Sequence, residues 1–302
     1  MSDAAREARA DGGATASTLA SAPTRDVFDD AQVAPTSVAE VLDLQQLAHD
    51  RFRAEPVSCT GRRTIYGGQV AAQALRAASL TVPDDRIAHS IHGYFLLAGD
   101  ASGPIELRVE RDRDGGRYSG RRVTAVQHDE VIFAMSCSFS RPKEGAEFQA
   151  VTIPPVAGPG ELETYQLNAS RTFDLEARVP EDPDPWYRWP ARLWLRIREP
   201  LSDDPNVRAC GVVFISDLCT GLSRAPLVEQ AGLLPSIDHA VWLHHCADPN
   251  DWLLVDLNPL ATAGGRGLYS GHIFDQRGKL LASLAQESLF DVTRGGSAPQ
   301  RR

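Results

Sequence analysis

The chain of 302 residues carries 31 Lys and Arg against 40 Asp and Glu, a formal net charge of −9, and is 42% hydrophobic and 24% charged. These are the proportions of a globular protein, and the length allows about two domains of ordinary size. The acidic balance disfavours a nucleic-acid binder, which needs a basic face, and no apolar run approaches the roughly 18–20 residues of a membrane span.

The first predicted elements are a tail and two helices. Residues 1–36 are rich in Ala, Ser, Thr and Asp and have little apolar periodicity, which predicts a disordered tail. Residues 37–40 read Ser-Val-Ala-Glu, the pattern of a capping box, so a short helix is expected to begin there. The next helix is expected to begin at Gly67, where an Ala-rich run to Ala78 is apolar nearly all round and therefore predicts a buried helix.

Strand patterns follow the second helix. Apolar and polar side chains alternate over residues 105–110 and again over 131–139, with β-branched and aromatic residues at many apolar positions. In the second run the alternation places Val131 and every second residue up to Phe139 on one face. Residues 37–145 therefore predict one unit, a buried helix followed by about four antiparallel strands.

The rest of the chain divides into a linker, a second unit and a short tail. Prolines recur throughout residues 146–190, which predicts a connection between domains rather than a long regular element. Three strand-like segments of the first unit recur farther along the chain at offsets of 147, 151 and 148 residues. This near-constant offset predicts a tandem repeat, with the second copy over residues 191–292 and a tail over residues 293–302.

Five segments carry a family pattern in a fixed order: Tyr66–Ala74, His89–Leu96, Ile215–Leu218, Ser236–His239 and Ala285–Glu287. Together they resemble the acyl-CoA thioesterase II family, and the resemblance covers about residues 38–291. The Gly-Gly-Gln helix start and the Ile-Asp-His segment are fairly specific to that family when they occur in one chain.

The resemblance implies an α+β fold, a tandem double hotdog in which each repeat is a long helix wrapped by an antiparallel β-sheet. It implies hydrolysis of fatty acyl-CoA to free fatty acid and CoA by an activated water, with no covalent enzyme intermediate, no cofactor and no metal. The family's catalytic Asp, hydroxyl and Gln fall on Asp217, Ser236 and Gln286. The family commonly has Thr in place of Ser236, and the serine hydroxyl is less rigid at its first torsion. The resemblance also implies a homo-oligomer.

The three implied catalytic residues also have a rationale in their surroundings. The repeat offset places them opposite Gly68, His89 and Ser138, so one catalytic group per chain is expected, in the second copy. Asp217 is expected at the start of the second-copy helix, where the helix dipole favours a carboxylate, although a simple helix cap gives the same pattern. Gln286 shares a strand face with Ala282 and Leu284, and an amide on an apolar face needs hydrogen-bond partners.

Substrate-binding residues are expected at Gly67, Gly68 and His89. Gly67 and Gly68 permit close approach of a substrate to a helix start, whose backbone N–H groups would stabilise the oxyanion of the attacked thioester. Simple packing of the helix against the sheet explains the two glycines equally well. The phosphates of CoA need positive charge, for which the candidates are Arg62, Arg63, Arg121, Arg122 and Arg266.

Four other functions are weighed against this one. A serine hydrolase lacks its G-x-S-x-G motif, and a dinucleotide fold lacks G-x-G-x-x-G before a helix. A metal site at Asp238, His239 and residues 244–246 is disfavoured because neighbouring strand residues point to opposite faces. The alternative of a different class is a non-catalytic acyl-CoA binding protein on the same scaffold.

The cellular address is expected to be the cytoplasm. The first residues do not have the basic and apolar regions of a signal peptide, and the chain ends without the peroxisomal Ser-Lys-Leu signal. The five cysteines include Cys59 and contain no CxxC pair, which disfavours a disulfide scaffold or zinc ribbon and favours a reducing compartment.

Overall fold

The computed structural model describes residues 34–58, 63–181, 190–231 and 234–292. Cys59, residues 1–33 of the predicted N-terminal tail and the whole predicted C-terminal tail lie outside these ranges. Within the described residues, no helix is long and apolar enough to cross a membrane.

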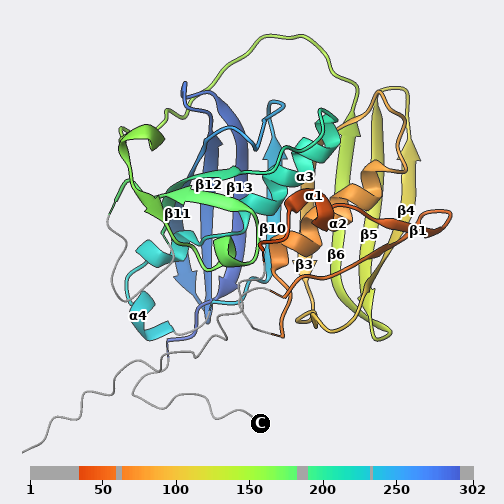
Figure 1. Cartoon of the computed structure of the whole chain (residues 1–302), viewed down its shortest axis with the longest axis horizontal. Helices are drawn as coiled ribbons and strands as arrows, with labels where there is room; N and C mark the ends of the chain where they lie inside the picture. The colour runs from red at the N-terminus through yellow and green to blue at the C-terminus, as the bar shows by residue number, and fades with distance from the viewer. Residues whose placement is uncertain (1–33, 59–62, 182–189, 232–233, 293–302) are drawn as a thin grey trace, which may run out of the picture. The chain divides into compact units, whose positions relative to one another are not determined.

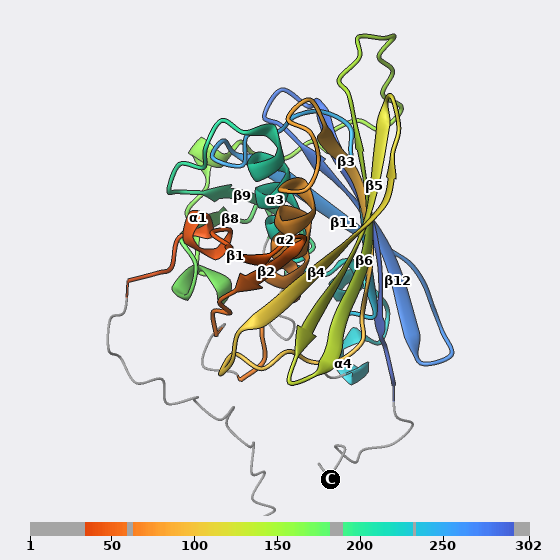
Figure 2. The same cartoon turned by 90° about the vertical axis from the view of Figure 1, so that its right-hand side faces the viewer.

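The described residues form one antiparallel sheet with helices on one face (Figures 1 and 2). The helices are α1 (Val38–Val41), α2 (Gly67–Ser79), α3 (Pro205–Ser216) and α4 (Val228–Ala231), with 3-10 turns η1 (Pro159–Glu161), η2 (Ala169–Arg171) and η3 (Gly221–Arg224). The first strands are β1 (Gln45–Ala48), β2 (Arg51–Ala54), β3 (Ile87–Phe95), β4 (Ile105–Asp114), β5 (Tyr118–Gln127) and β6 (Glu130–Ser140). The remaining strands are β7 (Thr164–Tyr165), β8 (Leu175–Arg178), β9 (Arg192–Ile197), β10 (Asp238–Leu243), β11 (Leu253–Ala263), β12 (Arg266–Phe274) and β13 (Leu280–Leu289).

The strand order repeats itself about the centre of the sheet. One half runs β2-β4-β5-β6-β3 and the other runs β10-β13-β12-β11-β9, so that β3 and β10 pair where the two halves meet. In each half, one helix lies in the chain between the strand at the outer edge and the strand at the centre of the sheet. This helix is α2, between β2 and β3, in the first half and α3, between β9 and β10, in the second. The topology therefore contains the two copies that the sequence offset predicts.

Helices α2 and α3 lie side by side and antiparallel on the inner face of the sheet (Figures 1 and 2). The Tyr66 hydroxyl, at the start of α2, donates to the carbonyl oxygen of Phe214 near the end of α3 at 2.6 Å. At the opposite end Arg76 forms an ion pair of 3.5 Å with Asp204, the N-cap of α3. The alanines of α2 are all buried, because small side chains allow both the second helix and the sheet to pack closely.

The capping box and the first predicted strand run are confirmed, and the second run is confirmed in part. Ser37 and Glu40 make both reciprocal capping hydrogen bonds at the start of α1. In β4 the apolar residues from Ile105 to Val109 are buried. The prediction that Val131 shares a face with Phe133 is wrong, since a bulge in the pairing of β5 with β6 turns Val131 outward and leaves Ile132 buried.

The predicted linker, residues 146–190, contributes structure to the second half. Strands β7 and β8 extend the sheet beyond β9. Upstream of them Val151, Ile153 and Val156 pack on the outer face of the sheet against a separate apolar cluster. That cluster consists of Trp194, Leu254 and Phe274. The prolines therefore interrupt regular structure while leaving apolar side chains that cover one outer face.

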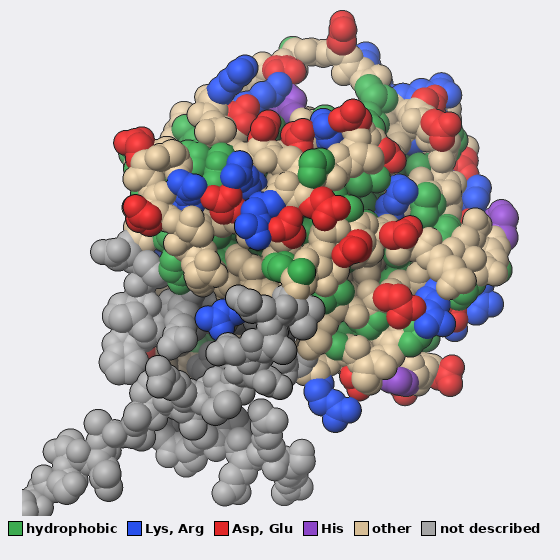
Figure 3. Space-filling model, viewed as in Figure 1, with side chains coloured by type: hydrophobic (Ala, Val, Ile, Leu, Met, Phe, Trp, Pro, Cys, Tyr) green, Lys and Arg blue, Asp and Glu red, His purple; other side chains and the backbone are tan. Residues whose placement is uncertain are grey.

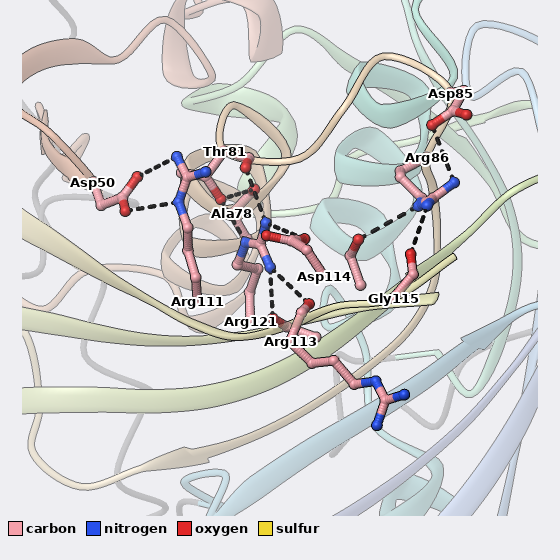
Figure 4. Close-up of polar contacts among 12 residues, drawn as sticks. Asp50, Ala78, Thr81, Asp85, Arg86, Arg111, Arg113, Asp114, Gly115 and Arg121 are labelled. Atoms are coloured by element: carbon pink, nitrogen blue, oxygen red, sulfur yellow. Dashed lines mark hydrogen bonds and ion pairs between the residues drawn. The ribbon is translucent and has the colours of Figure 1, made fainter. Parts of the chain in front are cut away.

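A buried arginine, Arg121, links the turn between α2 and β3 to the end of β4 and the start of β5 (Figure 4). The Arg121 side chain is fully buried and donates to the Thr81 hydroxyl at 2.9 Å, the Thr81 carbonyl at 3.0 Å and Asp114 at 2.7 Å. Nearby, buried Arg86 donates to the carbonyl oxygen of Gly115 (Figure 4). It also donates to the carbonyl oxygen of Gly116 at 3.1 Å. Guanidinium groups with these partners satisfy backbone acceptors that the turns leave unpaired.

Arg121→Met is expected to destabilise the fold by about 2–4 kcal/mol, because Thr81 and several backbone acceptors lose their donor inside the protein. The measurement is the free energy of unfolding from denaturant titration. Arg122→Met is the control, because Arg122 is exposed and, among the described residues, forms its ion pairs with the surface carboxylates Glu110 and Asp112. Equal midpoints for the two variants would contradict a structural role for Arg121.

Candidate active site

The site lies where the second copy departs from the first. The chain takes residues 80–86 to pass from α2 to β3, but residues 217–237 to pass from α3 to β10. Asp217 begins this longer connection and Ser236 lies near its end, while Gln286 comes from β13. This longer connection, residues 217–237, is the insertion of the second copy. It brings the side chains of Asp217 and Ser236 to β13.

The structure brings Gln286 within hydrogen-bond distance of both Asp217 and Ser236. The Gln286 amide nitrogen donates to the Asp217 carboxylate oxygen Oδ1 at 2.9 Å and to the Ser236 hydroxyl at 2.5 Å. Gln286 is 2% exposed and lies on the inward face of β13 with Ala282 and Leu284, as its strand pattern predicts. Both amide hydrogens of one buried side chain thus link two residues of the insertion.

The prediction that Asp217 starts a helix is wrong, because it is the C-cap of α3. The negative end of that helix dipole disfavours a carboxylate. The compensating positive end belongs to the other helix, since the backbone N–H of Gly68 in the first turn of α2 donates to Asp217. The antiparallel packing of α2 and α3 therefore supplies, from the first copy, the helix start that the sequence places in the second.

The two glycines at the start of α2 leave no room for a side chain. A Cβ on Gly67 would lie 2.8 Å from Asp217 Oδ2 and 2.9 Å from the Phe95 ring. A Cβ on Gly68 would lie 2.7 Å from the carbonyl oxygen of Phe214. Close helix packing and close approach to the carboxylate both require glycine here, which supports the packing explanation, while substrate binding at Gly67 and Gly68 stays a prediction.

Burial dominates the electrostatics of the site. It raises the pKa of Asp217, against the influence of His239 and the hydrogen bonds from Gln286 and Gly68. Burial also lowers the pKa of His239, a fully buried residue whose Nε2 lies 2.8 Å from the Ser216 hydroxyl. A carboxylate with a raised pKa beside a neutral imidazole is suited to accept a proton near neutral pH.

His239 is a residue of this site that the sequence pattern does not single out. The offset of 147 pairs it with His92, yet His92 is exposed and His239 is buried. The inward residues of β3 include Ile91 and Gly93, and those of β10 are His239 and Val241, so an offset of 147 pairs an inward with an outward residue and the matching offset at this strand is even. The alternation of buried His239 with buried Val241 in β10 is the signal that identifies it as an inward residue.

Two comparisons made from the constant offset, Gly68 with Asp217 and His89 with Ser236, are therefore corrected. Gly68 does not stand opposite Asp217, because α2 and α3 begin 138 residues apart (205 − 67) and Gly68 contacts the far end of α3. His89 lies away from the other predicted residues. Its neighbour Ala88 donates to Asn206 in the first turn of α3, about 16 Å along the helix from Asp217.

The candidate phosphate-binding arginines differ in how they are engaged. Three have carboxylate partners: Arg121 with Asp114, Arg122 with Glu110 and Asp112, and Arg266 with Glu287. Arg62 lies outside the described residues, whereas Arg63 is exposed and precedes the start of α2 by four residues. Figure 3 shows basic and acidic side chains interspersed over the face seen in Figure 1.

Two alternative chemistries, a cysteine nucleophile and a metal site, are compared with the described residues. Cys219, close to Asp217 in sequence, is buried, and burial raises the pKa of its thiol, which keeps it protonated. No group of three His, Cys, Asp or Glu side chains with metal-binding geometry occurs among residues 34–58, 63–181, 190–231 and 234–292.

Known proteins and family models match this sequence over most of its length. Residues 53–140 match the model of the acyl-CoA thioesterase N-terminal domain, and residues 149–290 match that of the acyl-CoA thioesterase C-terminal domain. The chain is 32% identical to acyl-CoA thioesterase 2 of Haemophilus influenzae, covering 84% of this chain and 96% of that protein. It is 31% identical to human acyl-coenzyme A thioesterase 8, covering 84% of this chain and 89% of that protein.

Solved structures give the same result. An acyl-CoA thioesterase II from Mycobacterium marinum is similar with a TM-score of 0.72 and 36% identity, covering 85% of this chain and 98% of that one. A protein described as having a hot dog fold, from Alicyclobacillus acidocaldarius, has a TM-score of 0.71 at 17% identity, covering 84% of this chain and 98% of that one. The predicted hotdog fold is thereby confirmed. The predicted long helix in each repeat is not confirmed, because the helices against the sheet have 13 and 12 residues.

Proposed function

Because the chain belongs to the acyl-CoA thioesterase family, we propose that it hydrolyses fatty acyl-CoA to free fatty acid and CoA at the site formed by Asp217, Ser236 and Gln286. Its curated relatives are acyl-CoA thioesterases, so the chain is a thioester hydrolase. The observation that carries the choice of residues is the Gln286 amide, which donates at once to Asp217 and Ser236.

The reaction needs one water, held and deprotonated beside the thioester. The water oxygen attacks the carbonyl carbon while Asp217 accepts one of its protons, and a tetrahedral oxyanion forms. The carbon–sulfur bond then breaks, the electron pair leaves with the CoA sulfur, and the proton held by Asp217 neutralises the thiolate. Ser236 and Gln286 orient the water and the carboxylate, which lowers the entropy cost of the attack.

The start of α2 contributes more to Asp217 than to the oxyanion. The Gly68 N–H is already used by the carboxylate, which it keeps aligned and partly stabilised in its charged form. Arg63 is the candidate for a CoA phosphate, because it is exposed and precedes this helix start. Its positive charge would meet a phosphate on the solvent side of the site.

Ser236→Ala is expected to reduce kcat on the order of 100-fold, because the water loses a hydroxyl partner and Gln286 loses an acceptor. Ser236→Thr is expected to retain activity, since the hydroxyl remains and the β-branch restricts its torsion. The measurement is release of free thiol from a series of short to long acyl-CoAs. Equal rates for the Ala variant and the wild type would exclude Ser236 from the catalytic group.

The same assay decides between hydrolysis and binding alone. The non-catalytic acyl-CoA binding protein considered from the sequence receives no support from the relatives, which are named as thioesterases. If the wild type releases no thiol from any acyl-CoA, the proposed function is wrong. Assembly as a homo-oligomer and residence in the cytoplasm stay predictions, for which size-exclusion chromatography with light scattering and cell fractionation are the tests.

A further inference from the structure

A second layer of buried polar groups lies behind the three proposed catalytic residues. Ser216 is the last residue of α3 and directly precedes Asp217 in the chain. Its hydroxyl lies 2.8 Å from Nε2 of His239, whose side chain is fully buried. A buried imidazole must find partners for both ring nitrogens or leave one of them unsatisfied.

The Gln286 side chain lies beside the ring of His239 and influences the pKa of that imidazole. The paired register of β10 with β13 ends at Ala240 and Ala285, so His239 and Gln286 are the next residues of the two neighbouring strands. Both side chains are buried. His239 Nδ1 and Gln286 Oε1 are buried atoms that make no hydrogen bond within the described residues.

The position of one proton decides whether this contact is favourable. If the neutral ring carries its proton on Nε2, both Nδ1 and Oε1 are acceptors and two buried lone pairs oppose each other. If the proton is on Nδ1, it can be donated to Oε1, and Nε2 accepts from the Ser216 hydroxyl. That hydroxyl also lies 2.9 Å from the carbonyl oxygen of Val213, a contact that a helical serine can exchange at low cost.

We propose that His239, as the Nδ1–H tautomer held by Ser216, is a positioning residue that fixes the orientation of the Gln286 amide. The hydrogen bonds then run in one direction, from Ser216 to His239, from His239 to Gln286, and from Gln286 to Asp217 and Ser236. Because Ser216 and Asp217 are adjacent in the chain, this path closes into a ring. The inference rests on the proposed function of those last three residues.

The orientation of the Gln286 amide matters because its oxygen and nitrogen can exchange places by a rotation of about 180° about the last side-chain bond. A flipped amide would present Oε1 to the Asp217 carboxylate, and two acceptors would oppose each other at the 2.9 Å contact. It would also remove the donor from Ser236, whose own proton would then turn toward Gln286 instead of toward the water. A fixed Nδ1–H donor on His239 makes the flipped amide unfavourable before substrate binds.

Two substitutions separate positioning from packing. Asn places an amide nitrogen near the position of Nδ1, whereas Gln extends to the position of Nε2 and can keep the contact with Ser216 without the Nδ1 donor. We expect His239→Gln to lower kcat on the order of 10- to 100-fold with little change in KM, because a small misplacement of a catalytic group slows the chemical step without weakening substrate binding. His239→Asn is expected to retain most of kcat, although it gives up the Ser216 contact.

The melting temperatures of both variants and the ¹⁵N NMR shifts of His239 in the wild type complete the test. An Nδ1–H signal and a kcat that is higher in the Asn variant than in the Gln variant at similar melting temperatures support the proposal. An Nε2–H signal, or kcat values that simply follow melting temperature, overturn it. Asp217→Asn in parallel keeps the outcomes distinct: if it is inactive while His239→Gln is fully active, positioning fails but the proposed function stands.

Discussion

Asp217→Asn is expected to lower kcat by about 10²–10⁴-fold, because the amide cannot accept the proton of the attacking water. The substitution preserves the size of the side chain and an oxygen for the Gln286 hydrogen bond at 2.9 Å. KM is expected to change little, since the carboxylate acts on the water rather than on the bound acyl-CoA. The measurement is steady-state thiol release from the best acyl-CoA substrate.

The pH dependence of the wild type follows from the same residue. Burial raises the pKa of Asp217, and the active form is the carboxylate, so kcat/KM falls as the pH drops through this raised value. The acid limb is therefore expected above the usual pKa of an aspartate, and it is expected to disappear in Asp217→Asn. An acid limb that is unchanged in the variant would assign the titration to another group.

Stability provides the control for this variant. A carboxyl group whose pKa is higher in the folded than in the unfolded protein stabilises the fold below the unfolded pKa and loses that contribution as the pH rises through the folded pKa. At neutral pH the buried charge therefore costs stability, which Asn does not. Asp217→Asn is expected to melt no lower than the wild type, and a lower melting temperature would leave misfolding as the cause of inactivity.

Gln286→Glu is expected to have the second-largest effect, a loss of about 10²–10³-fold in kcat at neutral pH. The new carboxylate has the shape of the amide but lies at the 2.9 Å contact with Asp217, where two like charges cannot both be ionised. The pair is expected to share a proton, so the acid limb of kcat/KM moves to higher pH than in the wild type. The measurement is the full pH profile of the variant.

Gln286→Met is the matched control for that experiment. It keeps the length of the side chain and its place on the apolar face of β13, but it removes both hydrogen-bond donors without adding charge. It is expected to lose kcat while its acid limb stays nearer to that of the wild type. The same shift of the limb in both variants would contradict the paired-carboxylate explanation.

Local patterns predict a large part of the fold. The helix that begins at Gly67, the capping box at Ser37 and the inward face of β4 depend on neighbouring residues, and their structure follows from propensity, capping and alternation. The tandem repeat is also visible, because β3 and β10 keep similar sequences. Bulges escape this reasoning, since one extra residue reverses the face of Val131 without changing the local composition.

Two of the predicted site residues lie in a connection that the repeat offset cannot align. The offset compares strands, whereas Asp217 and Ser236 lie in a connection that is longer in the second copy than in the first. Spacing therefore places Asp217 at a helix start, although the helix start beside it belongs to the first copy and reaches it only through the packing of α2 on α3. His239 escapes for a related reason, because its proposed role depends on Gln286, a residue of another strand that lies beside it only in the folded chain.

The central claim is that Asp217, Ser236 and Gln286 direct a water molecule at the thioester carbonyl without an acylated enzyme. The most direct measurement is a single turnover with enzyme in excess over acyl-CoA in ¹⁸O-labelled water, followed by mass spectrometry of the acid and of the protein. The account predicts one ¹⁸O atom in the first acid released and an unmodified, unlabelled enzyme. Unlabelled acid with ¹⁸O in the carboxyl group of Asp217, or an acyl group trapped on Ser236, would contradict it.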